Sequence, residues 1–300
     1  MLAKPPITNP FLAGKRRPIV VGHRGVPVLH QENTLAGFRR AVELGVPAVE
    51  LDVRLTADRR AVVLHDGDLT RLTGVRRDVM DLTWDQLSRL RIKRELSMGV
   101  DAHGAPVVAR YEREEPIPLL AEVLAEISSK VAINVELKLD LPRWWQVEVG
   151  AVVADEIHRA GAEDRVIVTS FDPRKLRAAG RVRPGLATGF CFDDTMLDFA
   201  GRLFDGRRML GRILDAHLVG RLLGSRVVGA EHTLVGSETV RSLHRLGVAI
   251  GTHTLFPLGS TTGKAISPAA SSPAEVERLV DLGVDWIESD DPERLMTLIS

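Results

Sequence analysis

Acidic side chains alternate with apolar ones in two short runs of this sequence. Glu50 and Asp52 alternate with valine and leucine in the run 49–53, and Glu136 has a similar place in the run 133–138. Side chains point to alternate faces of a strand, so Glu50 and Asp52 share one face. Adjacent carboxylates repel each other unless a cation lies between them. Three carboxylate oxygen donors without thiolates favour Mg²⁺ or Ca²⁺ as the bound ion. Alternatively, Glu50 and Asp52 could lie on a solvated face of an edge strand.

Two histidines stand where other apolar runs end. His23, followed by Arg24, ends the first run of the chain, His65 ends the third, and Lys138 ends the fourth. Taken singly, each histidine is compatible with a structural hydrogen bond, and Lys138 with an ion pair to Glu136. Ionisable residues at the ends of four successive runs favour a functional site instead. Imidazoles beside a divalent ion and two cationic side chains suit proton transfer around a phosphate.

The elements that position these residues alternate between short β-branched runs and longer stretches of helical period, which is typical of βα units with a parallel sheet. We therefore expect an α/β fold, an irregular TIM-type (β/α)8 barrel. Nine candidate strands compete for eight places, and we expect the extra one in the weakly patterned stretch 186–230. The segment 56–60 is too short for a packed helix, so one helix should be missing between strands two and three. The runs are 19–21, 48–53, 61–64, 131–137, 166–169, 186–190, 227–230, 248–251 and 286–289.

The expected layout is a lead-in over residues 1–17 followed by one barrel domain over residues 18–300. The polar stretch 93–116 is predicted to be a small inserted loop region. In the stretch 193–226, apolar residues recur at near-helical spacing among arginines and aspartates, which predicts an amphipathic helical segment. We expect it to pack on the barrel with a solvated face, with lipid contact as the less favoured alternative.

The composition excludes several classes of protein. Forty basic residues balance 40 acidic ones, which gives no support for a nucleic-acid partner. Cys191 is the only cysteine, so no disulfide can form within the chain. The N-terminal segment lacks the apolar core of a signal peptide, and no run approaches the roughly 20 apolar residues of a membrane span. We therefore expect a cytoplasmic protein whose membrane contact, if any, is peripheral.

The order of short motifs resembles that of a known family. From Ile19 to about Arg294 the chain is similar to the glycerophosphodiester phosphodiesterases of the phospholipase-C-like barrel superfamily. No single motif is specific, but the ordered set with this spacing is. The matching motifs are His23-Arg24-Gly25, Glu32-Asn33-Thr34, Glu50-Leu51-Asp52-Val53, Val62-Val63-Leu64-His65-Asp66, Leu69-Thr70-Arg71, Thr73-Gly74, Ile117-Pro118-Leu119, Asn134-Val135-Glu136-Leu137-Lys138, Ser170-Phe171, Gly283-Val284-Asp285-Trp286-Ile287, Ser289-Asp290 and Pro292.

The resemblance implies hydrolysis of glycerophosphodiesters to glycerol 3-phosphate and an alcohol, with a cyclic phosphate as the expected intermediate. It assigns the metal to the three carboxylates, proton transfer to the two histidines, with acid and base undecided, and phosphate contact to Arg24 and Lys138. Glu32 resembles the family's supporting glutamate. Asn33 and Asp66 are placed beside it as supporting residues, although Asn33 or Thr34 could simply cap the following helix.

One departure from the family pattern concerns the substrate. The family usually carries a tryptophan-threonine pair followed by asparagine at the end of the penultimate strand, where this chain has Gly251-Thr252-His253-Thr254. We expect a large pocket wall to be missing, with His253 as a candidate for its partial replacement. Phe171 and Glu231 are further pocket candidates, although structural hydrogen bonding is the simpler expectation for His253 and Glu231.

Three alternatives remain open for the activity. The first is a lysophospholipase-D or sphingomyelinase-D-like enzyme, which would act on a lysolipid rather than a small-molecule phosphodiester. The second is a catalytically silent relative that only binds phosphodiesters, and the retained histidines, carboxylates and Lys138 speak against it. The third is a metal-dependent sugar or keto-acid barrel enzyme, which would not require the two strand-end histidines in this order.

Overall fold

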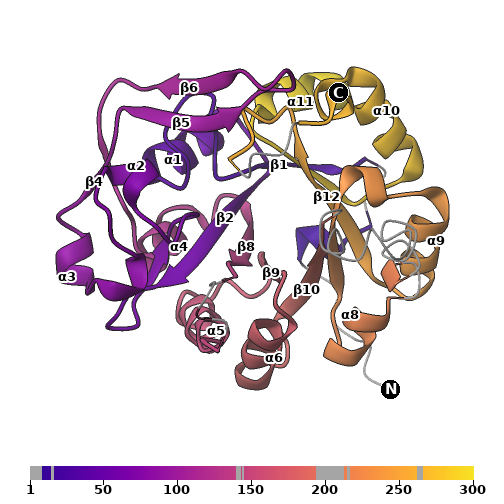
Figure 1. The fold of residues 1–300 in the computed structure, drawn as a ribbon. Coiled ribbons are helices and arrows are strands. Elements are labelled where there is room, and N and C mark those ends of the chain that lie inside the picture. The colour runs from indigo at the N-terminus through magenta and orange to yellow at the C-terminus, as the bar shows by residue number, and fades with distance from the viewer. Residues whose placement is uncertain are drawn as a thin grey trace, which may run out of the picture.

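The computed structural model describes residues 9–14, 17–139, 143, 145–193, 213–214, 217–261 and 266–300 (Figure 1). Eight parallel strands close into a ring, because β1 pairs with β2 on one side and with β13 on the other. The predicted TIM-type barrel is therefore confirmed. The ring strands, in spatial order, are β1 (Ile19–Gly22), β2 (Ala48–Leu55), β8 (Ala132–Leu137), β9 (Val166–Ser170), β10 (Ala187–Phe192), β11 (Val227–Glu231), β12 (Ala249–Leu255) and β13 (Trp286–Ser289).

The ninth candidate strand lies elsewhere than predicted. We expected the extra strand within 186–230, but both strands of that stretch belong to the ring. The strand outside is β3 (Ala61–Val63), which pairs antiparallel with the last three residues of β2. The segment 56–60 holds no helix, as expected. The predicted absence of a helix between the runs 48–53 and 61–64 is therefore confirmed. Because β3 lies outside the ring, the ring strands β2 and β8 are still connected through a helix, α4 (Leu120–Ile127).

The polypeptide between β3 and α4 forms an insertion beside the barrel, drawn in purple in Figure 1. The predicted loop at 93–116 contains an antiparallel hairpin of β5 and β6 rather than irregular chain. The insertion has its own apolar cluster, which includes Leu64, Leu72, Leu87 and Leu96. Its elements are α2 (Thr70–Thr73), η2 (Val79–Asp81), α3 (Trp84–Leu87), β4 (Arg91–Ile92), β5 (Glu95–Val100), β6 (Pro106–Arg110) and β7 (Glu115–Pro116).

Helices surround the ring, as Figure 1 shows, and the largest apolar cluster lies between them and the outward faces of the strands. Four of them have a side-chain N-cap: Thr34, Asp172, Ser272 and Asp291 each accept a hydrogen bond from the first turn of a helix. Besides α4, the outer helices are α1 (Leu35–Glu43), α5 (Val149–Arg159), α6 (Pro173–Val182), α8 (Leu218–Leu223), α9 (Ser237–Arg245), α10 (Pro273–Leu282) and α11 (Pro292–Ile299). Three short 3-10 turns are η1 (Pro10–Leu12), η4 (His232–Leu234) and η5 (Pro268–Ser271).

The barrel interior is apolar at the amino ends of the strands and charged at their carboxyl ends. Phe11, from the predicted lead-in, is buried against Trp286 with their ring centroids 5.5 Å apart. Small residues such as Ala48 and Ala132 complete this apolar layer. The layers above it carry the ionisable residues, which is the distribution expected of a barrel enzyme.

Part of the predicted amphipathic segment 193–226 lies outside the described residues, namely 194–212 and 215–216. Its described end forms α8. Among the residues that the structure describes, no helix is both long enough and apolar enough to cross a membrane.

Candidate active site

Three carboxylates meet toward the carboxyl ends of β2 and β8. Glu50, Asp52 and Glu136 each offer an oxygen, and these atoms lie within 4.8 Å of one another. The register aligns Asp52 with Glu136, so paired strands set the spacing. Glu50 and Asp52 are each 1% exposed, and Glu50 Oε1 has no hydrogen-bond partner among the described residues. Because an unpaired buried carboxylate is costly, this donor set fits a hard divalent cation.

The three carboxyl groups differ in their electrostatic surroundings. Burial, together with repulsion from Asp52, Glu288 and Glu136, raises the pKa of Glu50 well above its usual value. Burial would also raise the pKa of Asp52, but Lys138 and Arg24 outweigh it and hold that pKa well below its usual value. Lys138 Nζ lies 2.7 Å from Glu136 Oε1 and 3.2 Å from Asp52 Oδ1. Glu50 is therefore the carboxyl group least compensated by the protein's own cations.

His23 is fixed by residues from both ends of the chain. Its Nδ1 lies 2.6 Å from Asp290 Oδ1, and its Nε2 lies 3.9 Å from Glu50 Oε2. The next residue, Arg24, has φ of 54° and donates its backbone N–H to Glu50 Oε2 at 2.9 Å. A Cβ on Gly22 would lie 2.3 Å from the Gly25 carbonyl oxygen, so this tight turn requires glycine there.

His65 has a similar arrangement at the edge of the insertion. Its Nδ1 lies 2.7 Å from Asp66 Oδ1, and Asp66 Oδ2 lies 2.5 Å from Arg71 Nε. Burial and the nearby cations Arg24 and Lys138 lower the pKa of His65 to about 4. The imidazole is therefore unprotonated at neutral pH and can accept a proton.

Glu32 joins the two histidine regions through arginines. It accepts hydrogen bonds from Arg24 Nη1 at 3.1 Å and from Arg71 Nη2 at 2.7 Å. Glu32, His65 and Asp66 also have metal-ligand spacing, but Arg71 contacts both carboxylates of this group. A guanidinium already neutralises this second cluster, so the trio around Glu50 is the better cation site.

Asn33 and Thr34 have separate roles. Thr34 caps α1 by accepting a hydrogen bond from the Gly37 backbone N–H at 3.1 Å, as expected. Asn33 is not a cap: its Nδ2 donates to Asp52 Oδ2 at 2.7 Å, and its Oδ1 accepts from the Asp52 backbone N–H at 3.1 Å. Asn33 thus fixes the orientation of one candidate metal ligand.

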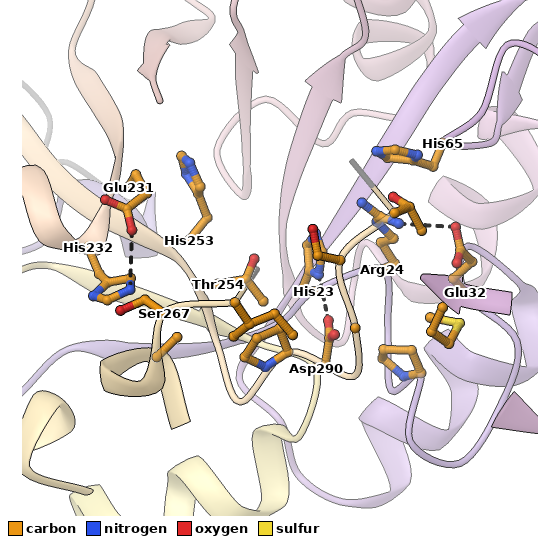
Figure 2. Close-up of a pocket in the computed structure, with 18 of the residues that line it drawn as sticks. His23, Arg24, Glu32, His65, Glu231, His232, His253, Thr254, Ser267 and Asp290 are labelled. Atoms are coloured by element: carbon orange, nitrogen blue, oxygen red, sulfur yellow. Dashed lines mark hydrogen bonds and ion pairs between the residues drawn. The ribbon is translucent and has the colours of Figure 1, made fainter. Parts of the chain in front are cut away.

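A cavity of about 390 Å³ opens above this site. His23, Arg24 and His65 line one end, and Glu231 and His253 line the other (Figure 2). Figure 2 shows His23 between Arg24 at one end of the cavity and Glu231 and His253 at the other. Glu50, Asp52, Glu136 and Lys138 are not part of the lining, but the Glu50 carboxylate lies 3.9 Å from Nε2 of the lining residue His23.

Two pocket candidates at the second end lie on strands, and the third, Phe171, directly follows β9 (Val166–Ser170) and does not line the cavity. His253 on β12 is aligned with Glu231 on β11, and the ring of Phe171 packs edge-on against His253 with centroids 6.0 Å apart. Gly251 lies two residues before His253 on β12, so it faces the same side of the strand but nearer the amino end of the barrel. A Cβ there would lie 1.8 Å from Cε2 of Trp286, so the indole of Trp286 occupies the space beside Gly251.

The sequence analysis gave no role to Asp290, Arg71 or Glu288. Asp290 and Arg71 were noted only within motifs, and they orient His23 and Asp66, respectively. Glu288 is 6% exposed inside the barrel and accepts a hydrogen bond from Asn134 Nδ2 at 2.8 Å. Asp290 follows an apolar strand just as His23 does, so the same signal could have identified it. The position of Arg71 in the sequence, by contrast, gives no sign that it contacts site residues.

The profile of the glycerophosphoryl diester phosphodiesterase family matches residues 23–294, which is most of the chain. The chain belongs to this family. It is accordingly an enzyme of the phosphoric diester hydrolase class.

Individual relatives agree with this family assignment. A glycerophosphodiester phosphodiesterase of Caldanaerobacter subterraneus subsp. tengcongensis is 29% identical over 282 residues, covering 94% of this chain and 97% of that protein. A crystal structure from Silicibacter pomeroyi DSS-3 has a TM-score of 0.72 at 24% identity and covers 97% of both chains. A phosphodiesterase of Oleispira antarctica, solved with the product sn-glycerol-3-phosphate, has a TM-score of 0.69 at 20% identity over 94% of this chain and 97% of that one. At these identities the structural neighbours support the fold.

Proposed function

We propose that this chain hydrolyses glycerophosphodiesters to glycerol 3-phosphate and an alcohol, with a divalent ion, Mg²⁺ or Ca²⁺, bound by Glu50, Asp52 and Glu136. The observation that carries the proposal is the convergence of three ligand oxygens within 4.8 Å beneath a cavity that both histidines line. When bound, such an ion would stabilise the negative charge that develops on the phosphate.

Arg24 and Lys138 would contact the phosphate from the two sides of Asp52. Arg24 Nε lies 3.1 Å from Asp52 Oδ2, and Lys138 Nζ lies 3.2 Å from Asp52 Oδ1. Both cations are thus held next to the place where the phosphodiester charge would lie. Fixed positive groups at this point stabilise the transition state without reorganisation.

The two histidines would divide the proton transfers. His65, unprotonated above its pKa of about 4, would accept the proton of the attacking glycerol hydroxyl. His23, whose Nδ1 faces Asp290, would donate from Nε2 to the leaving alcohol. Attack by the glycerol hydroxyl gives a cyclic phosphate, which water then opens with the proton transfers reversed.

A lysolipid substrate is the second candidate. The human lysophospholipase D GDPD1 is 34% identical over 122 residues, although the match covers only 40% of this chain and 36% of that protein. The distinguishing feature would be room for an acyl chain. Retention of the complete histidine and carboxylate set argues against a catalytically silent relative.

Product identification distinguishes the two substrates. The purified chain, with Mg²⁺ or Ca²⁺, is incubated with glycerophosphocholine and, in parallel, with lysophosphatidylcholine, and the released phosphate esters are separated. We expect glycerol 3-phosphate from the first and at most slow turnover of the second. Turnover of the lysolipid alone would replace the proposal with the lysophospholipase D activity.

A further inference from the structure

The cavity is larger than a phosphate site requires, and its second end is built from polar groups. We call this end the alcohol subsite and define it by Glu231, Thr254, His253, Ser267 and Ile266, all of which line the cavity. Figure 2 shows it across His23 from Arg24 and His65. His23, which would protonate the leaving alcohol, therefore lies between Arg24 and the alcohol subsite.

His253 has an unmet hydrogen-bonding requirement at this subsite. Its Nε2 is shielded from solvent and has no hydrogen-bond partner among the described residues. The edge-on contact with Phe171 at 6.0 Å restrains the ring. Buried polar atoms nearly always have a partner, and this nitrogen without one belongs to a residue that lines the cavity, which indicates that the ligand supplies the partner.

Glu231 is held in place by a chain of charged groups. Its Oε2 accepts the Thr233 backbone N–H at 2.9 Å, and its Oε1 lies 3.2 Å from His232 Nε2. His232 Nδ1 in turn lies 2.6 Å from Glu275 Oε1, which Arg278 also contacts. Both oxygens of Glu231 are therefore engaged, and the carboxylate forms a fixed wall beside His253.

This arrangement discriminates between classes of leaving alcohol. A quaternary ammonium or an alkyl chain would leave His253 Nε2 unpaired, since neither carries a hydrogen-bond donor or acceptor. A hydroxyl group can donate or accept, so it pairs with either tautomer of the imidazole. Sites built to bond a hydroxyl discriminate strongly against analogues that lack one.

We propose that the alcohol subsite binds the leaving alcohol of the substrate and that His253 Nε2 hydrogen-bonds a hydroxyl of that alcohol, so that the enzyme prefers phosphodiesters of polyhydroxylated alcohols. The proposal rests on the proposed glycerophosphodiesterase function and adds the class of leaving group. His253 is here a specificity-determining residue, while proton transfer remains with His23 and His65.

The test compares glycerophosphoglycerol, whose leaving alcohol carries further hydroxyls, with glycerophosphocholine. Steady-state kcat/KM is measured for both with the wild type, His253→Ala, His253→Gln, and the control His158→Ala, which removes an exposed histidine of α5. We expect the wild type to favour glycerophosphoglycerol. His253→Ala should reduce that preference about tenfold, the effect of about one hydrogen bond, and His253→Gln should retain part of it. His158→Ala should leave the preference unchanged.

Each other outcome has a definite meaning. Hydrolysis of both substrates with no preference for glycerophosphoglycerol, or an unchanged preference in a folded His253→Ala variant, would overturn the subsite while leaving the proposed function intact. If His253→Ala does not fold, the same criterion applies to His253→Gln, whose size and polarity are closer to those of histidine. Absence of hydrolysis of either substrate by the wild type would overturn the proposed function and the subsite with it.

Discussion

Asp290 Oδ1 lies 2.6 Å from His23 Nδ1, although the two residues are 267 positions apart in the sequence. Asp290 Oδ2 accepts the Leu258 backbone N–H at 2.7 Å. Asp290 therefore fixes the orientation of the imidazole and directs Nε2 into the site. It also ties His23 to the segment that follows β12, which borders the cavity.

Replacing Asp290 by asparagine should lower kcat by about 10–100-fold, because groups that orient a functional histidine typically contribute this much. KM for glycerophosphocholine should change far less, since Asp290 lies behind His23. Steady-state kinetics with a thermal unfolding control would measure both effects. Asn in place of the exposed Asp85, which forms a surface ion pair with Arg89, is a matched control with no expected effect. A kcat within twofold of wild type would contradict the orienting role.

Asn33 should support metal binding through Asp52. Asn33 has φ of 59°, so Asn33→Gly removes the amide while preserving the backbone conformation. We expect the Kd for Mg²⁺ or Ca²⁺, measured by titration calorimetry, to rise about tenfold or more, since outer-shell partners of metal ligands contribute at this level. An unchanged Kd would show that the paired strands alone position Asp52.

Metal affinity should depend on pH through Glu50. The pKa of Glu50 is raised well above its usual value by burial and by repulsion from the neighbouring carboxylates, and a bound cation requires the deprotonated form. Binding should therefore release protons, and the Kd should rise as the pH falls through this raised pKa. Calorimetry in buffers of different ionisation enthalpy measures the released protons. In Glu50→Gln the affinity should be weak and its pH dependence much smaller. A Kd in the wild type that is independent of pH down to the ordinary glutamate pKa would contradict this prediction.

The Gly251–Trp286 contact should be important for stability. A methyl group at Gly251 would lie 1.8 Å from Cε2 of Trp286, so we expect Gly251→Ala to lower the free energy of unfolding by roughly 1–3 kcal/mol, as is typical of overpacked cores. Denaturant titration measures the change. In a Trp286→Ala background the same substitution should cost much less, because the clash is gone. Equal costs in both backgrounds would exclude the indole as the cause.

Much of the site followed from strand patterns that are local in the sequence. Alternation placed Glu50 and Asp52 on one face, and the barrel ring brought Glu136 beside them, as predicted. The role of Asp290 was not predicted because it depends on closure of the ring, where β13 meets β1. A strand-end acid gives no indication of which residue it will face across such a long separation.

The position of β3 was mispredicted for a physical reason. An apolar run of three residues looks the same whether it extends a parallel ring or pairs antiparallel with its neighbour. Here β2 is eight residues long, and its last three residues pair with β3 beyond the stretch that pairs with β1. The insertion could then build a separate apolar cluster, whose contacts between distant leucines leave no periodic signal in the sequence.

The central claim is metal-dependent phosphodiester cleavage by the His23 site, and one assay tests it directly. Release of glycerol 3-phosphate from glycerophosphocholine is measured with Mg²⁺ or Ca²⁺, after chelation, after metal is restored, and in His23→Ala. The account predicts that chelation abolishes the release, that restored metal recovers it, and that His23→Ala lowers it by about 10²–10⁴-fold, the usual contribution of a general acid or base. Release that persists both after chelation and in His23→Ala would contradict it.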